Sequence, residues 1–415
     1  MKKVLSILLS VAMIVLCFAA CGKTDGDKSS TGKAANVKVG FIFLHDENST
    51  YDKNFITAAE EACKKASVEI LKKTNISETQ ACYDAAAELV DEGCNVIFAD
   101  SFGHEPYVIQ AAKKFPEVQF LHATGTKAHT EGLSNYHNAF ASIYEGRYLA
   151  GVAAGMKLNE MISSGKITAD KAKMGYVGAY TYAEVISGYT SFYLGAKSVC
   201  PSVTMEVTFT GSWYDETAEK EAAQKLINNG CVLISQHADS MGAPTACEAA
   251  GVPNVSYNGS TVSACPNTFI VSSRIDWAPY LEYAIDCVKN GKAIDTDWTG
   301  TLSTGSVVLT DVNTKAAAEG TQAKIDEVKA ELESGKLHVF DTSAFTVTVS
   351  DSKNKNATVD ADGHLTGYKA DIDSDADNTG DTEVVSDGYF HESEKRSAPC
   401  FDVQIDGITL LDTKF

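Results

Sequence analysis

Apolar runs of strand length alternate with helical patterns over most of this chain, and this alternation constrains the fold more than any other feature. Residues 212–240 show one unit of it. A helical pattern there has Ala222, Leu226 and Ile227 on its apolar side, and it leads into a buried strand predicted at 232–234 and then a polar loop. Strands that alternate with helices of this length indicate parallel sheets covered by helices on both faces.

The alternation runs in two series, which predicts two similar lobes with a cleft between them. The predicted strands are 37–43, 96–98 and 118–121 in the first series, 174–178, 203–209, 232–234 and 255–257 in the second, and a returning strand at 269–272. We expect lobe 1 to comprise residues 37–138 plus about 257–272, and lobe 2 to comprise 139–256 plus about 273–340. A chain of 415 residues, 44% of them hydrophobic, is long enough to fill two cores.

Residues 341–415 follow a different pattern. They are rich in Asp, Asn, Ser and Gly, with strand-like sequence at 339–349 and again near the end, which predicts an acidic, β-rich extension of lobe 2. The run 371–383 invites a calcium interpretation, but an EF-hand loop needs Gly at its sixth position and Glu at its twelfth, where this chain has Ala376 and Thr382. We therefore expect a solvated acidic loop and no metal site.

The first 21 residues predict export and a lipid anchor. Two lysines precede an apolar core and small residues before Cys21, which is typical of a secretory signal peptide. The end is similar to a bacterial lipobox, although Phe18 stands where Leu is usual. Cys21 would then carry the lipid on the extracytoplasmic face of the cell membrane, and residues 22–36 would form a flexible tether. The alternative is an ordinary signal peptide in which Cys21 has no role.

Charge and cysteine content exclude some classes of protein. A net charge of −20 argues against a nucleic-acid surface, because binding phosphates needs fields of Lys and Arg. Most of the 11 cysteines follow Cys21 at scattered spacings without a C-x-x-C pair. They fit small buried hydrophobic residues better than a disulfide framework.

Polar and aromatic side chains accumulate where the predicted strands end. Motifs of P-loop proteins, zinc proteases and serine hydrolases are absent, so we expect no enzyme, no catalytic residue and no cofactor. In open parallel sheets, ligands bind beyond the carboxyl ends of the strands. The candidate ligand-binding residues at these ends are Tyr51, Ser101, Phe102, Tyr182, Trp213, Gln236, His237, Asp239 and Trp277.

These residue types predict a site for a planar ring. The aromatic rings would stack on it, and Ser101, Gln236 and Asp239 would bond its edge. Ordinary packing is the alternative for any single aromatic residue, and their shared location favours binding. A carboxylate in a closed cleft must be hydrogen-bonded, and a purine N–H, an exocyclic amine or a ribose hydroxyl would each satisfy Asp239. For His137 and His237 we expect hydrogen bonding rather than proton transfer.

From residue 37 to about 309 the chain resembles the basic membrane protein family of lipid-anchored substrate-binding proteins, which serve ATP-driven importers. The resemblance is carried by 144–152 (YEGRYLAGV), 184–188 (EVISG), 212–215 (SWYD), 236–240 (QHADS) and 277–280 (WAPY). It implies an α/β protein with the two-lobed type I periplasmic-binding fold, in which crossover segments join two doubly wound parallel sheets. A β-rich C-terminal appendage would be added here. It also implies a monomeric, extracytoplasmic solute-binding lipoprotein of an ABC importer.

Members similar in these segments bind purine bases or nucleosides. By position, the resemblance puts Phe102 and Trp213 against the base and Asp239 on its polar edge. Residues 51–55 and 258–260 depart from the nucleoside-binding pattern, which favours a base over a ligand with ribose. The implied partners are the purine and the permease subunits, with membrane contact through the lipid only. A purine-modifying enzyme, and a receptor or sensor for a sugar or sugar-like solute, remain as competing classes.

Overall fold

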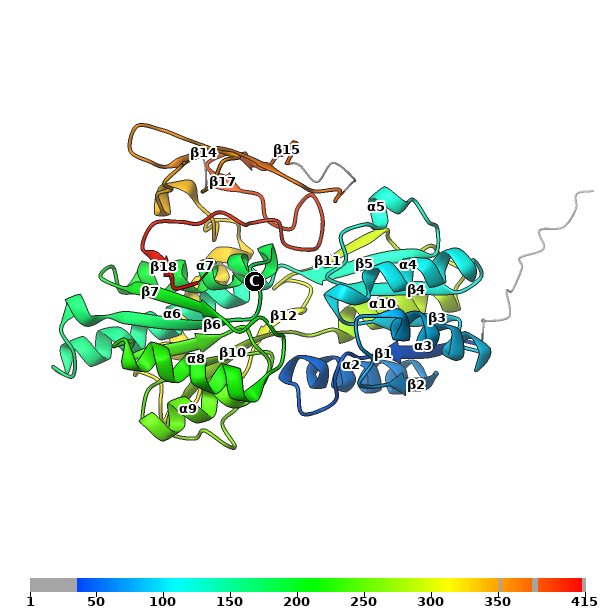
Figure 1. Cartoon of the computed structure of the whole chain (residues 1–415), viewed down its shortest axis with the longest axis horizontal. Helices are drawn as coiled ribbons and strands as arrows, with labels where there is room; N and C mark the ends of the chain where they lie inside the picture. Colours follow the sequence, from blue (N-terminus) through cyan, green and yellow to red (C-terminus); the bar gives the residue numbers. More distant parts are fainter. Residues whose placement is uncertain (1–35, 351–352, 375–379, 413–415) are drawn as a thin grey trace, which may run out of the picture.

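The computed structural model describes residues 36–350, 353–374 and 380–412. The expected signal peptide, Cys21 and nearly all of the expected tether lie outside these residues, as does part of the run 371–383. The described chain forms two α/β lobes side by side, and residues 341–412 lie over lobe 2 and extend toward lobe 1 (Figure 1). We refer to residues 341–412 as the appendage.

Lobe 1 is built on a parallel sheet in the order β11–β5–β4–β3–β1–β2. Its strands are β1 (Lys38–Ile42), β2 (Glu69–Lys73), β3 (Val96–Ala99), β4 (Gln119–Ala123), β5 (Tyr136–Ala141) and β11 (Asp297–Gly300). Its helices are α2 (Thr50–Ala66), α3 (Gln80–Asp91), α4 (Glu105–Lys114), the short α5 (Ala128–Glu131) and α10 (Ala278–Lys289). α2 packs with α10 and α3 packs with α4, in the two apolar clusters on either side of the sheet. A parallel sheet needs this cover because both of its faces are apolar.

Lobe 2 has a sheet in the order β12–β10–β9–β8–β6–β7–β18. Its strands are β6 (Lys173–Gly178), β7 (Thr204–Phe209), β8 (Leu233–Gln236), β9 (Asn254–Tyr257), β10 (Phe269–Ile275), β12 (Val307–Leu309) and β18 (Ile408–Leu410). Its helices are α6 (Ile143–Ser163), α7 (Ala183–Val199), α8 (Glu216–Asn228), α9 (Gly242–Ala250) and α11 (Thr321–Glu333). α6 packs with α7 and α8 packs with α9, and only the β10–β12 pair is antiparallel among the described strand pairs of this sheet.

The crossover segments differ from the prediction. The strand expected at 269–272 to return to lobe 1 is β10, which stays in the lobe 2 sheet, where Ser272 pairs with Ser256 of β9. The following α10 and β11 belong to lobe 1 instead, with Asp297 of β11 opposite Asn138 of β5. An apolar strand pattern carries no information about which sheet accepts the strand, because both edges offer the same backbone hydrogen bonds.

Three local elements also differ from the prediction. The polar edge strand β2 was not expected, since its exposed lysines and glutamate lack a strand pattern. Residues 135–138 were expected as a boundary, yet β5 begins at Tyr136 and is buried along its whole length. The sequence pattern predicts a loop over 45–54 before the first helix of lobe 1, but this loop is shorter, because Ser49 caps α2 by accepting a hydrogen bond from the backbone N–H of Asp52. This earlier start brings Tyr51 and Asp52 into the first helical turn.

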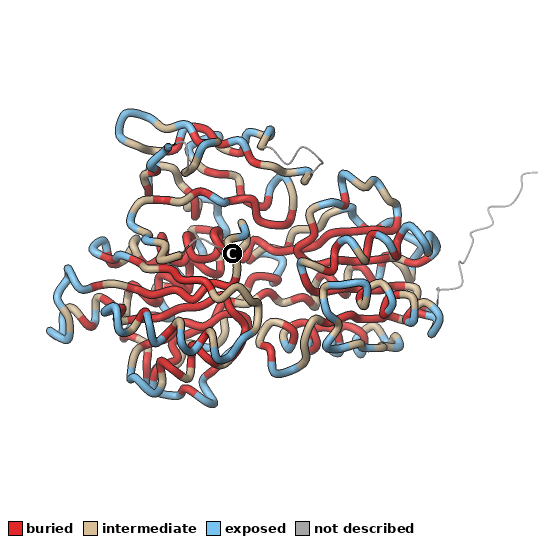
Figure 2. Tube along the Cα trace, in the orientation of Figure 1, coloured by how far each residue is buried: buried red, intermediate tan, exposed pale blue. Residues whose placement is uncertain are grey.

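The appendage is joined to lobe 2 through its own apolar core and through β18, which pairs with β7. Its strands are β13 (Ala357–Val359), β14 (Leu365–Ala370), β15 (Thr382–Glu383), β16 (Val385–Ser386) and β17 (Tyr389–Phe390). The strand expected at 339–349 does not form, because Phe340 and Phe345 turn inward to pack on Phe401. Figure 2 shows buried chain in the appendage as well as in the two sheets.

Helix α7 is buried on every side. All residues from Val185 to Ala196 are buried, and Gly195 lets α7 contact α6 through the backbone, since a Cβ there would lie 2.0 Å from the carbonyl oxygen of Tyr148. A helix that is apolar all round requires cover on all sides.

The nine cysteines in the described ranges are buried, as expected for small hydrophobic residues, and none of the nine is in a disulfide. Within the same ranges, no helix is long and apolar enough to cross a membrane.

Candidate ligand-binding site

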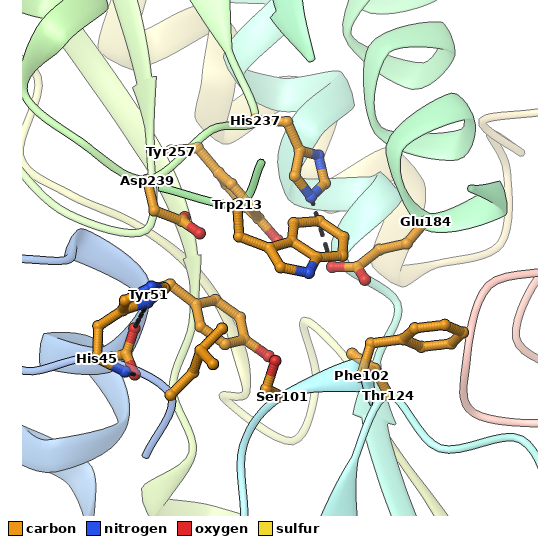
Figure 3. A pocket seen from close by; sticks show the side chains of 12 residues that line it. His45, Tyr51, Ser101, Phe102, Thr124, Glu184, Trp213, His237, Asp239 and Tyr257 are labelled. Carbon is orange, nitrogen blue, oxygen red and sulfur yellow. Dashed lines mark hydrogen bonds and ion pairs between the residues drawn. The ribbon is translucent and has the colours of Figure 1, made fainter. Parts of the chain in front are cut away.

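A cavity lies between the two lobes, at the carboxyl ends of strands from both sheets (Figure 3). The space within it, counted together with its opening to solvent, is about 370 Å³. The lining residues are Leu44, His45, Tyr51, Asp52, Ser101, Phe102 and Thr124 from lobe 1, and Glu184, Trp213, His237, Asp239 and Tyr257 from lobe 2.

The two lobes are closed on each other around this cavity. The backbone N–H and the hydroxyl of Thr50 both donate to the carbonyl oxygen of Asp239, at 3.0 Å each. The first turn of α2 in lobe 1 therefore contacts the loop after β8 in lobe 2. Asp239 in turn donates its backbone N–H to the carbonyl oxygen of Trp213, at 3.0 Å. This bond fixes the loop after β7 beside the loop after β8.

Two aromatic rings point into the cavity from opposite lobes. Figure 3 shows Tyr51 and Trp213 facing its centre, whereas the ring of Phe102 points away. The Tyr51 hydroxyl donates to the carbonyl oxygen of Asp100 at 2.8 Å, and Tyr180 packs edge-on against Trp213 with ring centroids 5.0 Å apart. Phe102 packs instead against Tyr182 across the cleft, at 5.3 Å. Tyr51 and Trp213 thus face the cavity from opposite lobes.

Two carboxyl groups lie together on the lobe 1 side. Asp52 accepts the backbone N–H of His45 at 2.7 Å, and Asp100 accepts that of Leu44 at 3.1 Å. Burial raises the pKa of Asp100 well above its usual range, and the charge of Asp52 adds to this effect. Burial acts on Asp52 as well, but hydrogen bonds from His45 and Ser49 outweigh it and lower the pKa of Asp52. Of the two carboxyl groups, Asp100 is the one whose protonated form this environment favours.

The carboxyl group of Asp239 is one of the polar groups that lobe 2 directs into the cavity. Its Oδ1 accepts a hydrogen bond from Nδ2 of Asn258 at 3.0 Å. Burial raises the pKa of Asp239 well above its usual range, with a further contribution from the charge of Glu219. This environment favours the protonated form of the Asp239 carboxyl group.

Glu184 and His237 form a second polar pair on lobe 2, with 3.5 Å between Oε1 and Nε2. Burial lowers the pKa of His237, against the raising effect of Glu184. Behind them, Arg147 lies fully buried over the ring of Tyr257, 4.1 Å from its centroid, and donates to the carbonyl oxygen of Gln236 at 3.1 Å. Burial lowers the pKa of Arg147 to about 10, so it remains a cation. Its hydrogen bond to the carbonyl oxygen of Gln236 holds the loop that carries His237 and Asp239.

Thr124 lines the cavity with a φ of 62°, a left-handed conformation that is rare for a β-branched residue. Strained backbone of this kind concentrates at functional sites.

Most of the sequence-predicted candidates meet at the cavity, and three do not. Tyr51, Ser101, Phe102, Trp213, His237 and Asp239 line it. Tyr182 lines an adjoining outer compartment. Gln236 is buried and uses its side-chain oxygen to accept from Asn254 at 2.9 Å. Trp277 is buried in the lobe 1 core, stacked on Phe55 at 4.3 Å, so its prediction as a ligand contact was wrong.

His137 also lies outside the cavity, because β5 starts beside it and its ring bonds Gln119 at 2.9 Å and the carbonyl oxygen of Asp295 at 3.0 Å.

The prediction missed several lining residues. Asp52 lines the cavity because α2 starts earlier than expected. Ser49, a typical helix-capping residue, could have indicated this start. Tyr257 stands at the end of a correctly expected strand and was not singled out. Glu184 lay within a segment that carried the family resemblance, but nothing marked its side chain as facing the cleft. Within the described residues no group of His, Cys, Asp and Glu side chains could hold a metal ion.

Comparison with known proteins identifies the class. A profile of the Bmp family, PnrA-like ABC transporter substrate-binding proteins, matches residues 41–335. A purine-binding protein of Brucella abortus is 29% identical over 308 residues, covering 73% of this chain and 83% of that protein. A Haloferax volcanii protein, provisionally named for ABC transporter glucose binding, is 27% identical over 332 residues and 78% of each chain. Among solved structures, an ABC transporter solute-binding protein from Aeropyrum pernix matches with a TM-score of 0.61 at 16% identity, over 76% of this chain and 94% of that one.

These similarities confirm the two-lobed fold and the prediction of a binding protein rather than an enzyme. The profile spans both lobes and every lining residue of the cavity, and its match ends before the appendage. The chain therefore belongs to the Bmp family of PnrA-like ABC transporter substrate-binding proteins.

Proposed function

We propose that the protein captures a purine base or purine nucleoside in the closed cavity and delivers it to the permease of an ABC importer. One observation supports this proposal above all. The rings of Tyr51 and Trp213 face the cavity from opposite lobes, and the carboxyl group of Asp239 lines the same cavity. A purine is planar, apolar on its two faces and rich in donors and acceptors along its edge. It matches a cavity with two rings and several carboxyl groups.

Closure of the lobes provides the coupling to transport. A ligand held between Tyr51 and Trp213 touches both lobes, so it binds the closed form more tightly and shifts the population toward it. The closed form already joins Thr50 to Asp239 across the cleft. A permease that recognises the closed arrangement would then receive only loaded protein.

We also propose that the protein is anchored by a lipid on Cys21. The basis is the sequence of the first 21 residues, and ABC substrate-binding proteins act outside the cytoplasm. Replacement of Cys21 by Ser should move the protein from the membrane fraction to the medium or periplasm, as followed by fractionation. Equal retention of both forms in the membrane fraction would contradict the anchor.

The ligand class is tested by a thermal-shift panel of adenine, guanine, hypoxanthine, their nucleosides, ribose and glucose. We expect the purines to raise the melting temperature. At a ligand concentration of 100 times Kd, binding should add roughly 2.7 kcal/mol to the free energy of unfolding. The name of the Brucella relative supports this outcome, and that of the Haloferax relative supports the competing class, a receptor or binder for a sugar. A rise with glucose or ribose and none with any purine would replace the proposal by that class.

A further inference from the structure

The appendage connects the two lobes, in addition to the segments in which the chain itself crosses between them. It is rooted in lobe 2, where β18 pairs with β7, and it extends toward lobe 1 (Figure 1). There Oδ2 of Asp297 in β11 accepts the backbone N–H of Ser397 at 2.8 Å, and Thr299 donates to the carbonyl oxygen of Ser393 at 3.4 Å. This connection lies beyond the match to the family profile, which ends at residue 335.

The bonds to Asp297 and Thr299 lie at the edge of lobe 1 from which the chain crosses to lobe 2. β5 leads into α6 and β11 leads toward β12, and β5 and β11 are neighbours at this edge of the sheet. The crossover segments act as the hinge when two such lobes separate. A rotation moves the groups nearest its axis least, so these two bonds can persist while the cleft opens.

The contact between Thr50 and Asp239 lies far from that edge. Thr50 begins α2, which follows β1, and β1 stands four strands from β11 in the sheet. At about 4.8 Å per strand this is roughly 19 Å. Rotation about the crossover segments therefore separates Thr50 from Asp239 much more than it separates β11 from the appendage.

The appendage also covers one side of the cleft. Thr124 and Glu184, which line the cavity, share the adjoining outer compartment with Arg396 of the appendage. On the same side, Thr130 of α5 in lobe 1 donates to the carbonyl oxygen of Asp373. A ligand that left the cavity in this direction would meet the appendage.

The other side of the cleft has a groove beside Thr50 and Asn258. Among the described residues, those that line this groove come from the two lobes alone. The contact between Thr50 and Asp239, which opening breaks, is at this side.

We propose that the appendage is a strap that stays bound to both lobes while the cleft opens. It limits how far lobe 1 swings away from lobe 2, and it restricts the entry and exit of a ligand to the side of Thr50 and Asp239. The strap acts on the motion of the protein itself, so it works in the same way whichever solute the cavity takes.

The test is residue-resolved hydrogen exchange of the full mature chain without ligand. The backbone N–H of Thr50 is bonded across the cleft and that of Ser397 is bonded from the appendage to lobe 1, so their protection reports the opening of two different contacts. We expect Thr50 to be protected about tenfold less than Ser397, or less still. The N–H of Lys53, which donates to the carbonyl oxygen of Ser49 within α2, should be protected more than Thr50, which separates opening of the lobes from fraying of the helix.

A triple variant, Thr130→Val/Asp297→Ala/Thr299→Val, removes the lobe 1 side of the three bonds. Protection of the Ser397 N–H should fall about tenfold or more, since a bond to a carboxylate is lost. The radius of gyration from small-angle X-ray scattering should rise, because the lobes can then swing further apart. The matched control is Thr130→Ser/Asp297→Asn/Thr299→Ser, which keeps each donor and acceptor and should behave as the natural protein does.

The N–H of Met205, which donates to the carbonyl oxygen of Gly407, checks that the appendage remains rooted in lobe 2 and should stay protected in every variant. If Ser397 is protected no more than Thr50 in the natural protein, the appendage releases lobe 1 on opening and the strap is overturned. An unchanged radius of gyration in the triple variant would also overturn it, since the bonds would not limit the opening. Failure of the purines to bind would leave both measurements as they are.

Discussion

At the level of single residues, two tryptophans that follow strands lie in different environments. Trp213 follows β7, is partly exposed, and faces the cavity beside Tyr180. Trp277 follows β10 at the crossover, is 1% exposed, and packs among Phe55, Phe98 and Phe140. The difference arises because the loop after β7 ends in the cleft, whereas the chain after β10 enters the core of lobe 1.

Trp213→Ala should weaken purine binding by roughly 1–3 kcal/mol, the usual contribution of stacking one base on an aromatic ring. Titration calorimetry measures the change, and Trp213→Phe, which keeps a ring, should recover part of it. An unchanged affinity in the alanine variant would assign Trp213 to packing alone.

Trp277→Ala should act on stability instead. It empties a fully buried site, so we expect a loss of about 3–5 kcal/mol in the free energy of unfolding by denaturant titration. The relative affinities for different purines should remain as they were. A change in ligand preference with little loss of stability would contradict the placement of Trp277 in the core.

At the scale of elements, the first turn of α8 holds the loop that carries Asp239. Glu219 in that turn accepts the backbone N–H of Ser240 at 3.1 Å and that of Asp215 at 3.1 Å. Burial raises the pKa of Glu219 to about 7 from its usual value of 4.5. The folded protein therefore binds a proton here over a pH range in which the unfolded chain has released it.

Because this pKa is raised on folding, stability should fall as the pH rises from about 4.5 to about 7, by at most about 3 kcal/mol from this group. Glu219→Gln mimics the protonated acid, so it should flatten the pH dependence of the melting temperature between pH 5 and pH 7. Glu216→Gln, an exposed change in the same helical turn, is the control and should leave the slope unaltered. Equal slopes in natural and Glu219→Gln protein would contradict a protonated Glu219.

At the scale of the whole molecule, the appendage is part of the folded unit rather than a separate attachment. Its Phe345 and Phe401, together with Phe340 just before it, belong to the same continuous apolar cluster as α6 and α7. Tyr144 of α6 packs on Phe340 at 5.4 Å, and β18 covers the edge of β7. The burial of α7 on all sides follows from this arrangement.

A chain that ends at residue 338 should lose more than about 5 kcal/mol of stability, since each buried aromatic ring contributes roughly 1.5–3 kcal/mol. We expect a low soluble yield and a broad thermal transition by circular dichroism. A soluble truncated protein that melts cooperatively near the temperature of the full chain would show that the lobes do not need the appendage.

Local patterns in the sequence were enough to predict the α/β class, the two lobes, most of the strands and the neighbourhood of the site. These features follow from local periodicity and from the rule that parallel strands share one carboxyl edge. For this reason Tyr51, Phe102, Trp213 and Asp239 could be selected before any coordinates were considered. The family resemblance rested on contiguous segments, which are also local.

Three-dimensional packing determines which sheet accepts β10 and which tryptophan reaches the cavity. It also turns the ring of Tyr51 toward the centre of the cavity and the ring of Phe102 away from it. It also brought Glu184 and Lys369 to one compartment, although they are far apart in the chain. Local pattern cannot fix such relations, because every strand edge offers equivalent hydrogen bonds and a side chain's burial depends on what packs over it.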